Sequence, residues 1–260
     1  MEPYPLRVIG NSYVFLDPDD DCEAAAKALE ECNYSEDLCI GRDFESGFIA
    51  RLMAAGFLVM SEVLSGASPE EGNITILLPK HHLVRSCLFF PDLHIKKSIR
   101  SKLSLYDLRF DSDFDIILDK CLAIHGRGWL TAPLVDALRE MRAEKKPPVR
   151  PVSFGLYRNG ELRAGEFGII AGRIYTSYSG YFEETNAGTA QMILTAQYLE
   201  RNSFAFWFIK RECSLLHCST SSFWYALYDS GSRARGWRIS CCCYKLGCSS
   251  KYYKSRRVVT

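Results

Sequence analysis

The chain has 260 residues, of which 47% are hydrophobic and 24% are charged, so it has the composition of a globular protein and not of a disordered tail. The formal net charge of +1 is unevenly distributed: residues 1–72 carry fifteen acidic and four basic side chains, whereas residues 208–260 carry two acidic and ten basic ones. No run of about 18 apolar residues occurs and the N-terminus lacks the basic and apolar parts of a signal peptide, so we expect a cytoplasmic protein without a membrane segment.

Residues 1–42 are acidic and contain one Ala-rich helical piece, from Asp21 to Glu31. We interpret this part as an N-terminal extension whose charges face solvent, in preference to a surface that binds a basic partner. An apolar helix face that includes Phe48 and Leu52 then leads into a strand that starts at Phe57, so a compact domain begins at about residue 43.

The first half of this domain mixes strands and helices. Residues 74–78 and 86–90 read as strands, and we expect them to pair as a hairpin around Pro79-Lys-His-His82. A strand is predicted near residues 105–110. The two clearest helices are expected at 113–124 and 132–143.

The second half begins with a strong hairpin signal. Asn159-Gly160 separates two apolar runs, 152–157 and 161–170, and Asn-Gly suits the type I′ turn that matches strand twist. A third strand around Tyr175, a helix and a last strand at 203–207 follow. Three antiparallel strands, a helix and one more strand form the central pattern of the GNAT-type acyltransferase fold. We therefore predict an α+β, GNAT-like, mostly antiparallel sheet flanked by helices.

The segment from Arg173 to Leu199 is the most informative part of the chain. It is predicted to be a strand, a loop and a helix in direct succession, and small hydroxyl residues give the strand a polar face. The loop therefore lies at a helix N-terminus, where free N–H groups favour an anionic or carbonyl oxygen. We expect a binding site here.

The composition changes abruptly after Trp207. Residues 208–260 hold six of the eleven cysteines and ten basic residues, with no sustained apolar period. No repeated C-x-x-C pair supports a zinc site, so we predict no metal. We interpret 208–260 as a poorly ordered, non-homologous tail, in preference to a divergent basic extension.

Several short motifs in 43–207 together resemble the leucyl/phenylalanyl-tRNA–protein transferases, and the eukaryotic members more than the bacterial ones. The motifs are Ile49-Ala-Arg-Leu-Met53, Gly56-Phe-Leu58, Leu77-Leu-Pro-Lys80, Arg109-Phe-Asp-Ser-Asp-Phe114, Gly128-Trp-Leu130, Val152-Ser-Phe154, Ala164-Gly-Glu-Phe-Gly168, Tyr175-Thr-Ser-Tyr-Ser-Gly180 and Asn186-Ala-Gly188. The resemblance implies an aminoacyltransferase that moves Leu, Phe or a similar apolar amino acid from aminoacyl-tRNA to the N-terminal α-amine of a protein and so marks it for degradation. It implies no diffusible cofactor, and we expect a monomer.

The same resemblance suggests site residues. The family's strand carboxylate falls on Tyr178, and its acid and amide after the last strand fall on Phe208 and Lys210, so none of the three is retained. Tyr178 and Glu166 are the remaining catalytic candidates. The residues implied for aminoacyl and adenosine binding are Trp129, Tyr175, Ser177, Ser179, Gly180, Asn186, Met192, Thr195 and Leu199. The basic residues expected to contact tRNA phosphates are Lys80, Arg85, Lys96, Lys97 and Arg100.

Two other functions remain open. The loss of the acid and the amide is compatible with a catalytically impaired scaffold that only binds tRNA or protein. A CoA-dependent GNAT acetyltransferase shares the expected fold, but the loop before the helix contains Glu183 and Glu184, which would repel a diphosphate.

Overall fold

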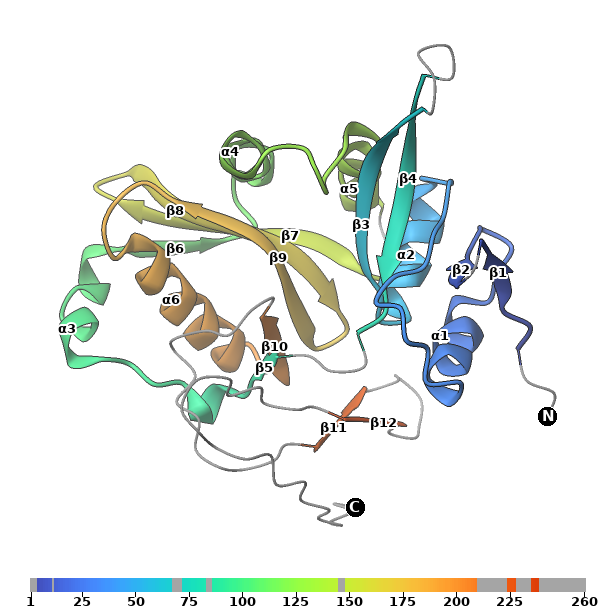
Figure 1. Ribbon diagram of the computed structural model, residues 1–260. Coiled ribbons are helices and arrows are strands. Elements are labelled where there is room, and N and C mark those ends of the chain that lie inside the picture. The colour runs from blue at the N-terminus through green and yellow to red at the C-terminus, as the bar shows by residue number, and fades with distance from the viewer. Residues whose placement is uncertain are drawn as a thin grey trace, which may run out of the picture.

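The computed structural model describes residues 4–10, 12–66, 72–82, 86–144, 148–209, 224–227 and 235–238. A six-stranded sheet with the strand order β5-β10-β9-β8-β7-β6 forms the centre of the molecule (Figure 1). Its strands are β5 (Ser86–Leu88), β6 (Asp107–Phe110), β7 (Arg150–Arg158), β8 (Glu161–Ala171), β9 (Ile174–Phe182) and β10 (Phe206–Ile209). Only β9 and β10 run parallel. The expectation of an α+β protein with a mostly antiparallel sheet is confirmed.

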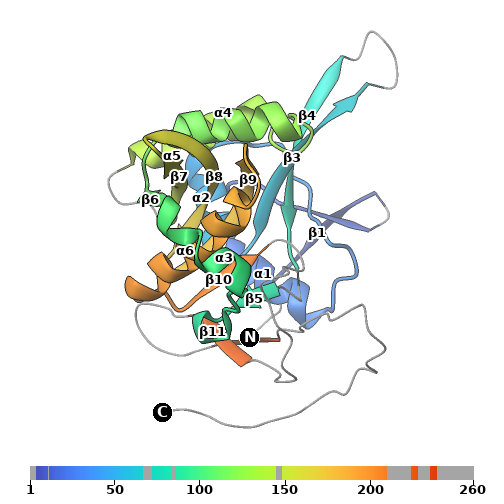
Figure 2. The same ribbon diagram turned by 90° about the vertical axis from the view of Figure 1, so that its left-hand side faces the viewer.

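Helices cover both faces of this sheet. The helices are α1 (Cys22–Glu31), α2 (Ser46–Ala54), α3 (Lys97–Arg100), α4 (Phe114–His125), α5 (Ala132–Ala143) and α6 (Ala187–Arg201), with 3-10 turns η1 (Phe90–Asp92) and η2 (Leu103–Leu105). Figures 1 and 2 show α4 and α5 on one face and α6 on the other. None of the helices in the described ranges is long and apolar enough to cross a membrane.

The predicted hairpin of the second half is present as β7 and β8. Asn159 has φ 52° and Gly160 has φ 81°, the left-handed conformations that a two-residue type I′ turn needs at both positions. The strand, helix and strand that follow are β9, α6 and β10, as expected from the periodicity.

A β-bulge in β9 decides which side chains face which helix. Phe167 pairs with Ser179 and Gly168 pairs with Ser177, so Tyr178 is the extra residue on β9. Tyr178 packs in the core under α4 and α5, and Ser179 lies close to Cys121 of α4. A regular strand would place Ser179 on the same face as Ser177, so the bulge divides the polar face expected from alternation.

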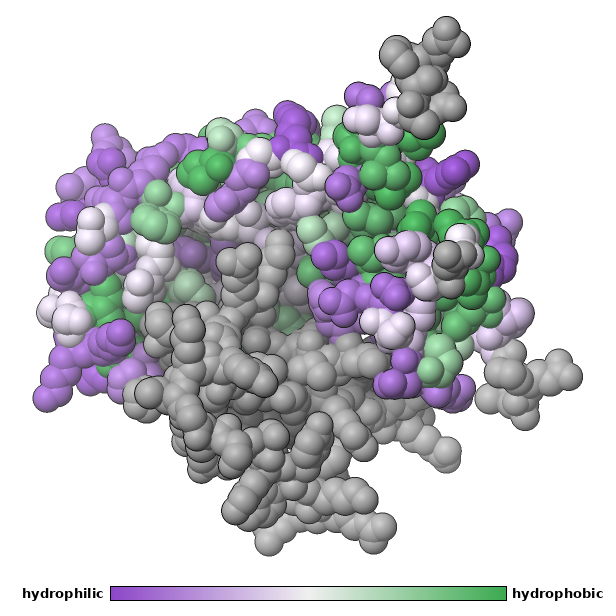
Figure 3. Space-filling view, in the orientation of Figure 1, coloured by the Kyte–Doolittle hydropathy of each residue, from purple (hydrophilic) through white to green (hydrophobic). Residues whose placement is uncertain are grey.

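The predicted hairpin of residues 74–78 with 86–90 is wrong. β4 (Asn73–Lys80) pairs instead with β3 (Leu58–Ser65) over eight residue pairs, and β5 pairs with β10 at the edge of the central sheet. The longer register available to β3 and β4 explains the preference, because each cross-strand pair adds to stability. The β3–β4 ribbon projects from the body (Figures 1 and 2), and its outer part exposes Val63, Leu64 and Ile74 as a hydrophobic surface (Figure 3).

The acidic N-terminal segment shares its core with the rest of the molecule. It forms β1 (Arg7–Ile9), β2 (Tyr13–Phe15) and α1. Leu16 and Leu29 are buried in one cluster with Phe48 and Ile49 of α2. The boundary predicted near residue 42 remains a prediction, but the described residues on its two sides pack together.

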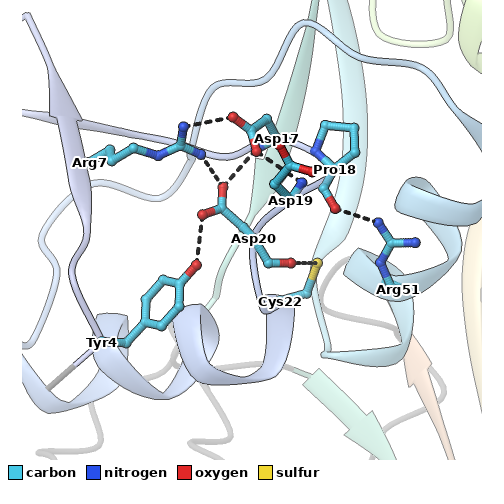
Figure 4. Close-up of polar contacts among 8 residues, drawn as sticks. All are labelled: Tyr4, Arg7, Asp17, Pro18, Asp19, Asp20, Cys22 and Arg51. Carbon is cyan, nitrogen blue, oxygen red and sulfur yellow. Dashed lines mark hydrogen bonds and ion pairs between the residues drawn. The ribbon is translucent and has the colours of Figure 1, made fainter. Parts of the chain in front are cut away.

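Several acidic side chains of this segment have partners within the fold. Arg7 forms ion pairs with Asp17 and Asp20, and the Tyr4 hydroxyl donates to Asp20 Oδ1 at 2.7 Å (Figure 4). Arg51 of α2 donates to the Pro18 carbonyl oxygen at 2.8 Å. The two carboxylates therefore tie the N-terminal segment to itself, and a backbone carbonyl group joins its loop to α2.

Beyond β10, which includes the first two residues of the predicted tail, two short pieces of that tail are described. β11 (Trp224–Leu227) and β12 (Arg235–Arg238) pair antiparallel as a separate two-stranded sheet. The remaining residues beyond Ile209, with the tail cysteines, lie outside the described residues, so the expectation of a poorly ordered tail stays a prediction.

Candidate functional site

Glu166 is a buried carboxylic acid on the α6 face of the sheet. Its neighbour Phe167 points to the opposite face, where its ring meets Phe114 of α4, so strand alternation turns Glu166 toward α6. Glu166 is only 4% exposed. The Ser177 hydroxyl, on the adjacent strand β9, donates a hydrogen bond to Glu166 Oε2 at 2.8 Å.

Polar side chains of α6 complete the surroundings of this carboxyl group. Gln191 and Thr195 are one turn apart and buried, and Gln191 Nε2 donates to Thr195 Oγ1 at 3.0 Å. Both side chains, with the fully buried Tyr175 hydroxyl, lie near enough to the Glu166 carboxylate to favour its charged form. Ser177 alone meets ordinary hydrogen-bond geometry with it in the described part of the chain.

Burial dominates the acidity of Glu166. It raises the pKa of this carboxyl group to about 7, against the opposing effect of the hydrogen bond from Ser177 and of the nearby polar groups of Gln191, Tyr175 and Thr195. Burial and the neighbouring Glu166 together raise the pKa of Tyr175 well above its usual value. At neutral pH, therefore, Glu166 can both accept and release a proton, whereas Tyr175 stays neutral.

The carboxyl group accepts a hydrogen bond from the residue of β9 that follows its described pairing with β10. Within the described residues, β10 pairs with β9 from Ile174 to Thr176. Ser177 is the next residue along β9, and its side chain is half-buried. Because the two strands run parallel, both lead toward the same end of the sheet. The Ser177 hydroxyl thus connects the buried acid to the part of β9 that is less buried.

Tyr178, the other predicted catalytic residue, lies on the opposite face. Its hydroxyl oxygen accepts a hydrogen bond from the Val59 backbone N–H at 3.1 Å, and its ring centroid is 6.3 Å from that of Trp129. The Trp129 carbonyl oxygen in turn accepts a hydrogen bond from the Ser61 backbone N–H at 2.9 Å. The structure therefore brings Tyr178 and Trp129 together near β3 and separates both from Glu166.

The other predicted binding residues divide in the same way. Tyr175, Ser177 and Thr195 surround Glu166, and Gly180 pairs with it across the strands. A Cβ at Gly180 would lie 3.1 Å from Glu166 Cβ, so close packing explains this glycine.

Met192, Leu199 and Asn186 have structural environments of their own. Met192 and Leu199 pack in apolar clusters between α6 and the sheet. Asn186 is the N-cap of α6 with φ 73°, a left-handed conformation that Asn tolerates better than most residues. The roles predicted for all three stay predictions.

The basic residues expected to bind RNA do not form one patch. Lys96, Lys97 and Arg100 are exposed in and around α3, and no acidic side chain of the described residues pairs with them. Lys80 ends β4 in the ribbon, and Figure 1 shows that ribbon at the opposite end of the sheet from α3. Arg85 lies outside the described residues.

Gln191 is a site residue that was not predicted from the sequence. It occurs among the buried residues Ala187, Ala190 and Ile193 of α6. The sequence did hold a usable signal: a polar residue stands on an apolar helix face, four residues before Thr195, and buried polar groups need hydrogen-bond partners.

The loop before α6 has its two carboxylates already paired. Glu183 forms an ion pair with Lys120, and Glu184 accepts a hydrogen bond from Tyr106 and pairs with Arg158.

A shallow surface depression, lined by Asp115, Arg139, Arg142 and Ala143, lies at α4 and α5 on the face away from Glu166. Within the described residues, no group of three His, Cys, Asp or Glu side chains is arranged to hold a metal ion.

Phe208, the residue predicted to take the position of the family's acid, is buried among apolar side chains. It is 8% exposed and packs with Ile174 and Phe206, whereas Lys210, predicted to take the position of the amide, lies outside the described residues. Within its described residues, the fold thus defines an α+β protein with a buried carboxyl group between β8, β9 and α6.

Residues 87–217 match the family model described as leucyl/phenylalanyl-tRNA protein transferase. This stretch is half of the chain, and the chain belongs to that family. The match ends beyond Trp207, at residue 217. The tail boundary predicted at residue 208 remains a prediction.

The similar curated proteins are bacterial leucyl/phenylalanyl-tRNA–protein transferases. The protein of Campylobacter lari is 24% identical over 177 residues, which cover 68% of this chain and 79% of that protein. The protein of Pseudomonas putida is 27% identical over 125 residues, which cover 46% of this chain and 54% of that protein, and a Campylobacter jejuni relative is likewise matched over 54% of its length. The chain therefore spans about half the length of the latter two. The predicted closer resemblance to eukaryotic members stays a prediction.

Two solved structures show weak similarity. One is the C-terminal domain (DUF2156) of an Agrobacterium fabrum protein, with a TM-score of 0.36 and 12% identity over 78% of this chain and 65% of that one. The other is a conserved Bacteroides thetaiotaomicron protein of unknown function, with a TM-score of 0.33 and 13% identity over 77% and 70% of the two chains.

Proposed function

We propose that this protein transfers leucine, phenylalanine or a similar apolar amino acid from aminoacyl-tRNA to the N-terminal α-amine of a protein, which marks that protein for degradation. The observation that carries the proposal is Glu166. Its carboxyl group has a pKa of about 7, close to that of an α-amine, and accepts a hydrogen bond from Ser177 of β9. Membership of the transferase family supports the same activity.

The reaction requires little from the enzyme beyond position and proton transfer. The aminoacyl ester is already activated, so the amine attacks its carbonyl carbon directly and no covalent enzyme intermediate is needed. Glu166 is the proton acceptor in this proposal. The hydroxyl-rich strand β9 and the start of α6 receive the aminoacyl end of the tRNA, and the reaction uses neither a metal nor a diffusible cofactor.

The finer aspects of the proposal follow from the family. The domain is GNAT-like in its succession of β7, β8, β9, α6 and β10. The protein acts in the cytoplasm as a monomer, with aminoacyl-tRNA and a protein N-terminus as its partners. Exposed Lys96, Lys97 and Arg100 contact the tRNA backbone.

Transfer of radiolabelled leucine or phenylalanine from charged tRNA to a protein that begins with Arg or Lys tests the proposal. We expect incorporation that depends on the chain and is reduced by about 100-fold in Glu166→Gln, the range for loss of a general base. Absence of incorporation, with all twenty charged tRNAs supplied, would refute it.

A second candidate is a catalytically impaired scaffold. Apolar Phe208 at the position of the family's acid favours it. Tight tRNA binding without any transfer would select this candidate.

A CoA-dependent acetyltransferase is less favoured, because a diphosphate at the start of α6 would have to approach Glu183 and Glu184. Calorimetric titration with CoA tests this candidate. Binding of CoA in the micromolar range would reverse the ranking.

A further inference from the structure

Glu166 is too deeply buried to meet a substrate amine directly. Only 4% of this residue is exposed, and α6 packs over it. Ser177 is half-buried and belongs to the part of β9 that extends beyond the described β10 pairing. A proton that travels between Glu166 and a reacting amine therefore needs an intermediate group, and the Ser177 hydroxyl is in contact with the acid.

The direction of the hydrogen bond defines what Ser177 can do. The hydroxyl donates its single proton to Glu166 Oε2 at 2.8 Å. A serine oxygen has two lone pairs, so the Ser177 oxygen keeps acceptor capacity for an N–H donor on its other side. The Ser177 hydroxyl is therefore oriented to accept a proton on its oxygen while it passes its own proton to Glu166.

We propose that Ser177 and Glu166 form a proton relay in which Ser177 contacts the incoming α-amine and Glu166 stores the proton. The inference rests on the aminoacyl transfer proposed above and adds Ser177 as a catalytic residue. Gln191 is a positioning residue in this relay, since it holds Thr195 and lies against the carboxylate without reaching the amine.

The relay balances the proton of the reaction. The neutral amine attacks the ester carbonyl carbon, and a C–N bond forms while the carbonyl π electrons move to oxygen. The ammonium nitrogen then gives a proton to Ser177 Oγ, as the Ser177 proton moves to Glu166 Oε2. When the tetrahedral intermediate collapses, the bond to the tRNA ribose oxygen breaks, and the stored proton returns through Ser177 to that oxygen. The products are an amide and a free tRNA hydroxyl, with Glu166 again ionised.

The groups that face Glu166 permit this cycle. β9 contributes Tyr175, Ser177 and, across the strand pair, Gly180; α6 contributes Gln191 and Thr195. Burial, together with the charge of Glu166, raises the pKa of the Cys121 thiol of α4 to about 12, so this thiol stays neutral. Among these described neighbours, Glu166 is the group that titrates near neutral pH.

Ser177→Ala, Ser177→Thr and wild-type protein are compared by single-turnover transfer between pH 5.5 and 8.5. We expect Ser177→Ala to lower the transfer rate by about 100-fold with unchanged affinity for charged tRNA, and Ser177→Thr, which keeps the hydroxyl, to restore most of the rate. Below pH 7 the logarithm of the wild-type rate should fall with a slope greater than one, because both the substrate amine and Glu166 become protonated. In Ser177→Ala the slope should be one, because only protonation of the amine then lowers the rate.

Rates in mixtures of H2O and D2O add a measurement that a purely structural role does not affect. Two protons move in the relay, so a plot of the wild-type rate against the deuterium fraction should curve upward. The same plot for the residual Ser177→Ala rate should be linear. The control is Ser153→Ala, which removes another buried hydroxyl of the same sheet, bonded to the Ser112 carbonyl oxygen at 2.7 Å. It should keep the pH profile and the curvature.

Each outcome decides the matter. A wild-type protein that transfers while Ser177→Ala keeps both the rate and the wild-type slope at acid pH would overturn the relay and leave the proposed function intact. A wild-type protein without any transfer would overturn both.

Discussion

The Tyr178 hydroxyl oxygen accepts a hydrogen bond from the Val59 backbone N–H at 3.1 Å and so joins the central sheet to the β3–β4 ribbon. Val59 is fully buried, and its N–H would have no water to replace this partner. We expect Tyr178→Phe to lower the free energy of unfolding by about 1–3 kcal/mol, the cost of an unsatisfied buried donor. Urea unfolding followed by circular dichroism measures it. Tyr13→Phe, at an exposed tyrosine, should change the free energy of unfolding little. Equal stability of the two variants would contradict the hydrogen bond between Tyr178 and Val59.

Gly168 should not tolerate a side chain. A Cβ at this position would lie 2.3 Å from the Thr176 carbonyl oxygen and 2.6 Å from the Tyr175 ring, next to the β9 bulge. Gly168→Ala is expected to destabilise the fold by about 3 kcal/mol or more, because the backbone atom cannot move aside cheaply. Gly128, whose Cβ would meet no atom within 4 Å, provides the matched control. Thermal melts of the two alanine variants should differ clearly; similar melting temperatures would refute the packing at β8.

Arg142 should contribute more to stability than Arg139, one turn earlier on α5. Arg142 donates to Asp111 Oδ1 at 2.6 Å and to the Pro151 carbonyl oxygen at 2.8 Å, and lies over the Phe114 ring. We expect Arg142→Ala to cost about 1–3 kcal/mol of unfolding free energy. Arg139 pairs only with exposed carboxylates, so Arg139→Ala should cost less than about 1 kcal/mol. The prediction fails if chemical denaturation ranks the two variants in the reverse order.

The acidity of Glu166 should make stability depend on pH. The pKa rises from 4.5 to about 7 on folding, so between these values the folded state binds a proton that the unfolded chain has released. Stability therefore falls as pH rises through this window. Glu166→Gln cannot ionise, so it should gain about 3 kcal/mol relative to wild type between pH 4 and pH 7.5. Denaturant unfolding of both proteins at each pH gives the difference between their free energies of unfolding. Groups that titrate alike in both proteins cancel in this difference. A constant difference would show that the carboxyl group is not buried as described.

The exposed cations around α3 should govern the salt dependence of tRNA binding. Replacement of Lys96, Lys97 and Arg100 by Ala is expected to weaken binding and to reduce the slope of log affinity against log salt by about 1 for each phosphate that the variant no longer neutralises. Lys27→Ala, on α1, removes an exposed cation elsewhere and should leave the slope unchanged. Filter binding at several salt concentrations gives both slopes. An unchanged slope in the triple variant would place the RNA on another surface.

The local elements of this protein were readable from its sequence wherever one short-range signal decided them. Asn159-Gly160 fixed the β7–β8 turn because two positive φ angles in succession suit few other residue pairs. The helices α4 and α5 followed from apolar spacing alone, since a helix buries one stripe irrespective of what it packs against. Glu166 became a candidate through the family resemblance, as the carboxylate that remains in the motif Ala164-Gly-Glu-Phe-Gly168.

Tertiary structure decided which strands pair and which side chains meet. β4 pairs with β3 and β5 with β10 because pairing depends on register between distant segments, which no local pattern reports. The bulge at Tyr178 placed this tyrosine and Ser179 on one face and left Ser177 with Glu166 on the other, because one inserted residue reverses the alternation of a strand. The high pKa of Glu166 likewise arises only when α6 covers it and removes it from water.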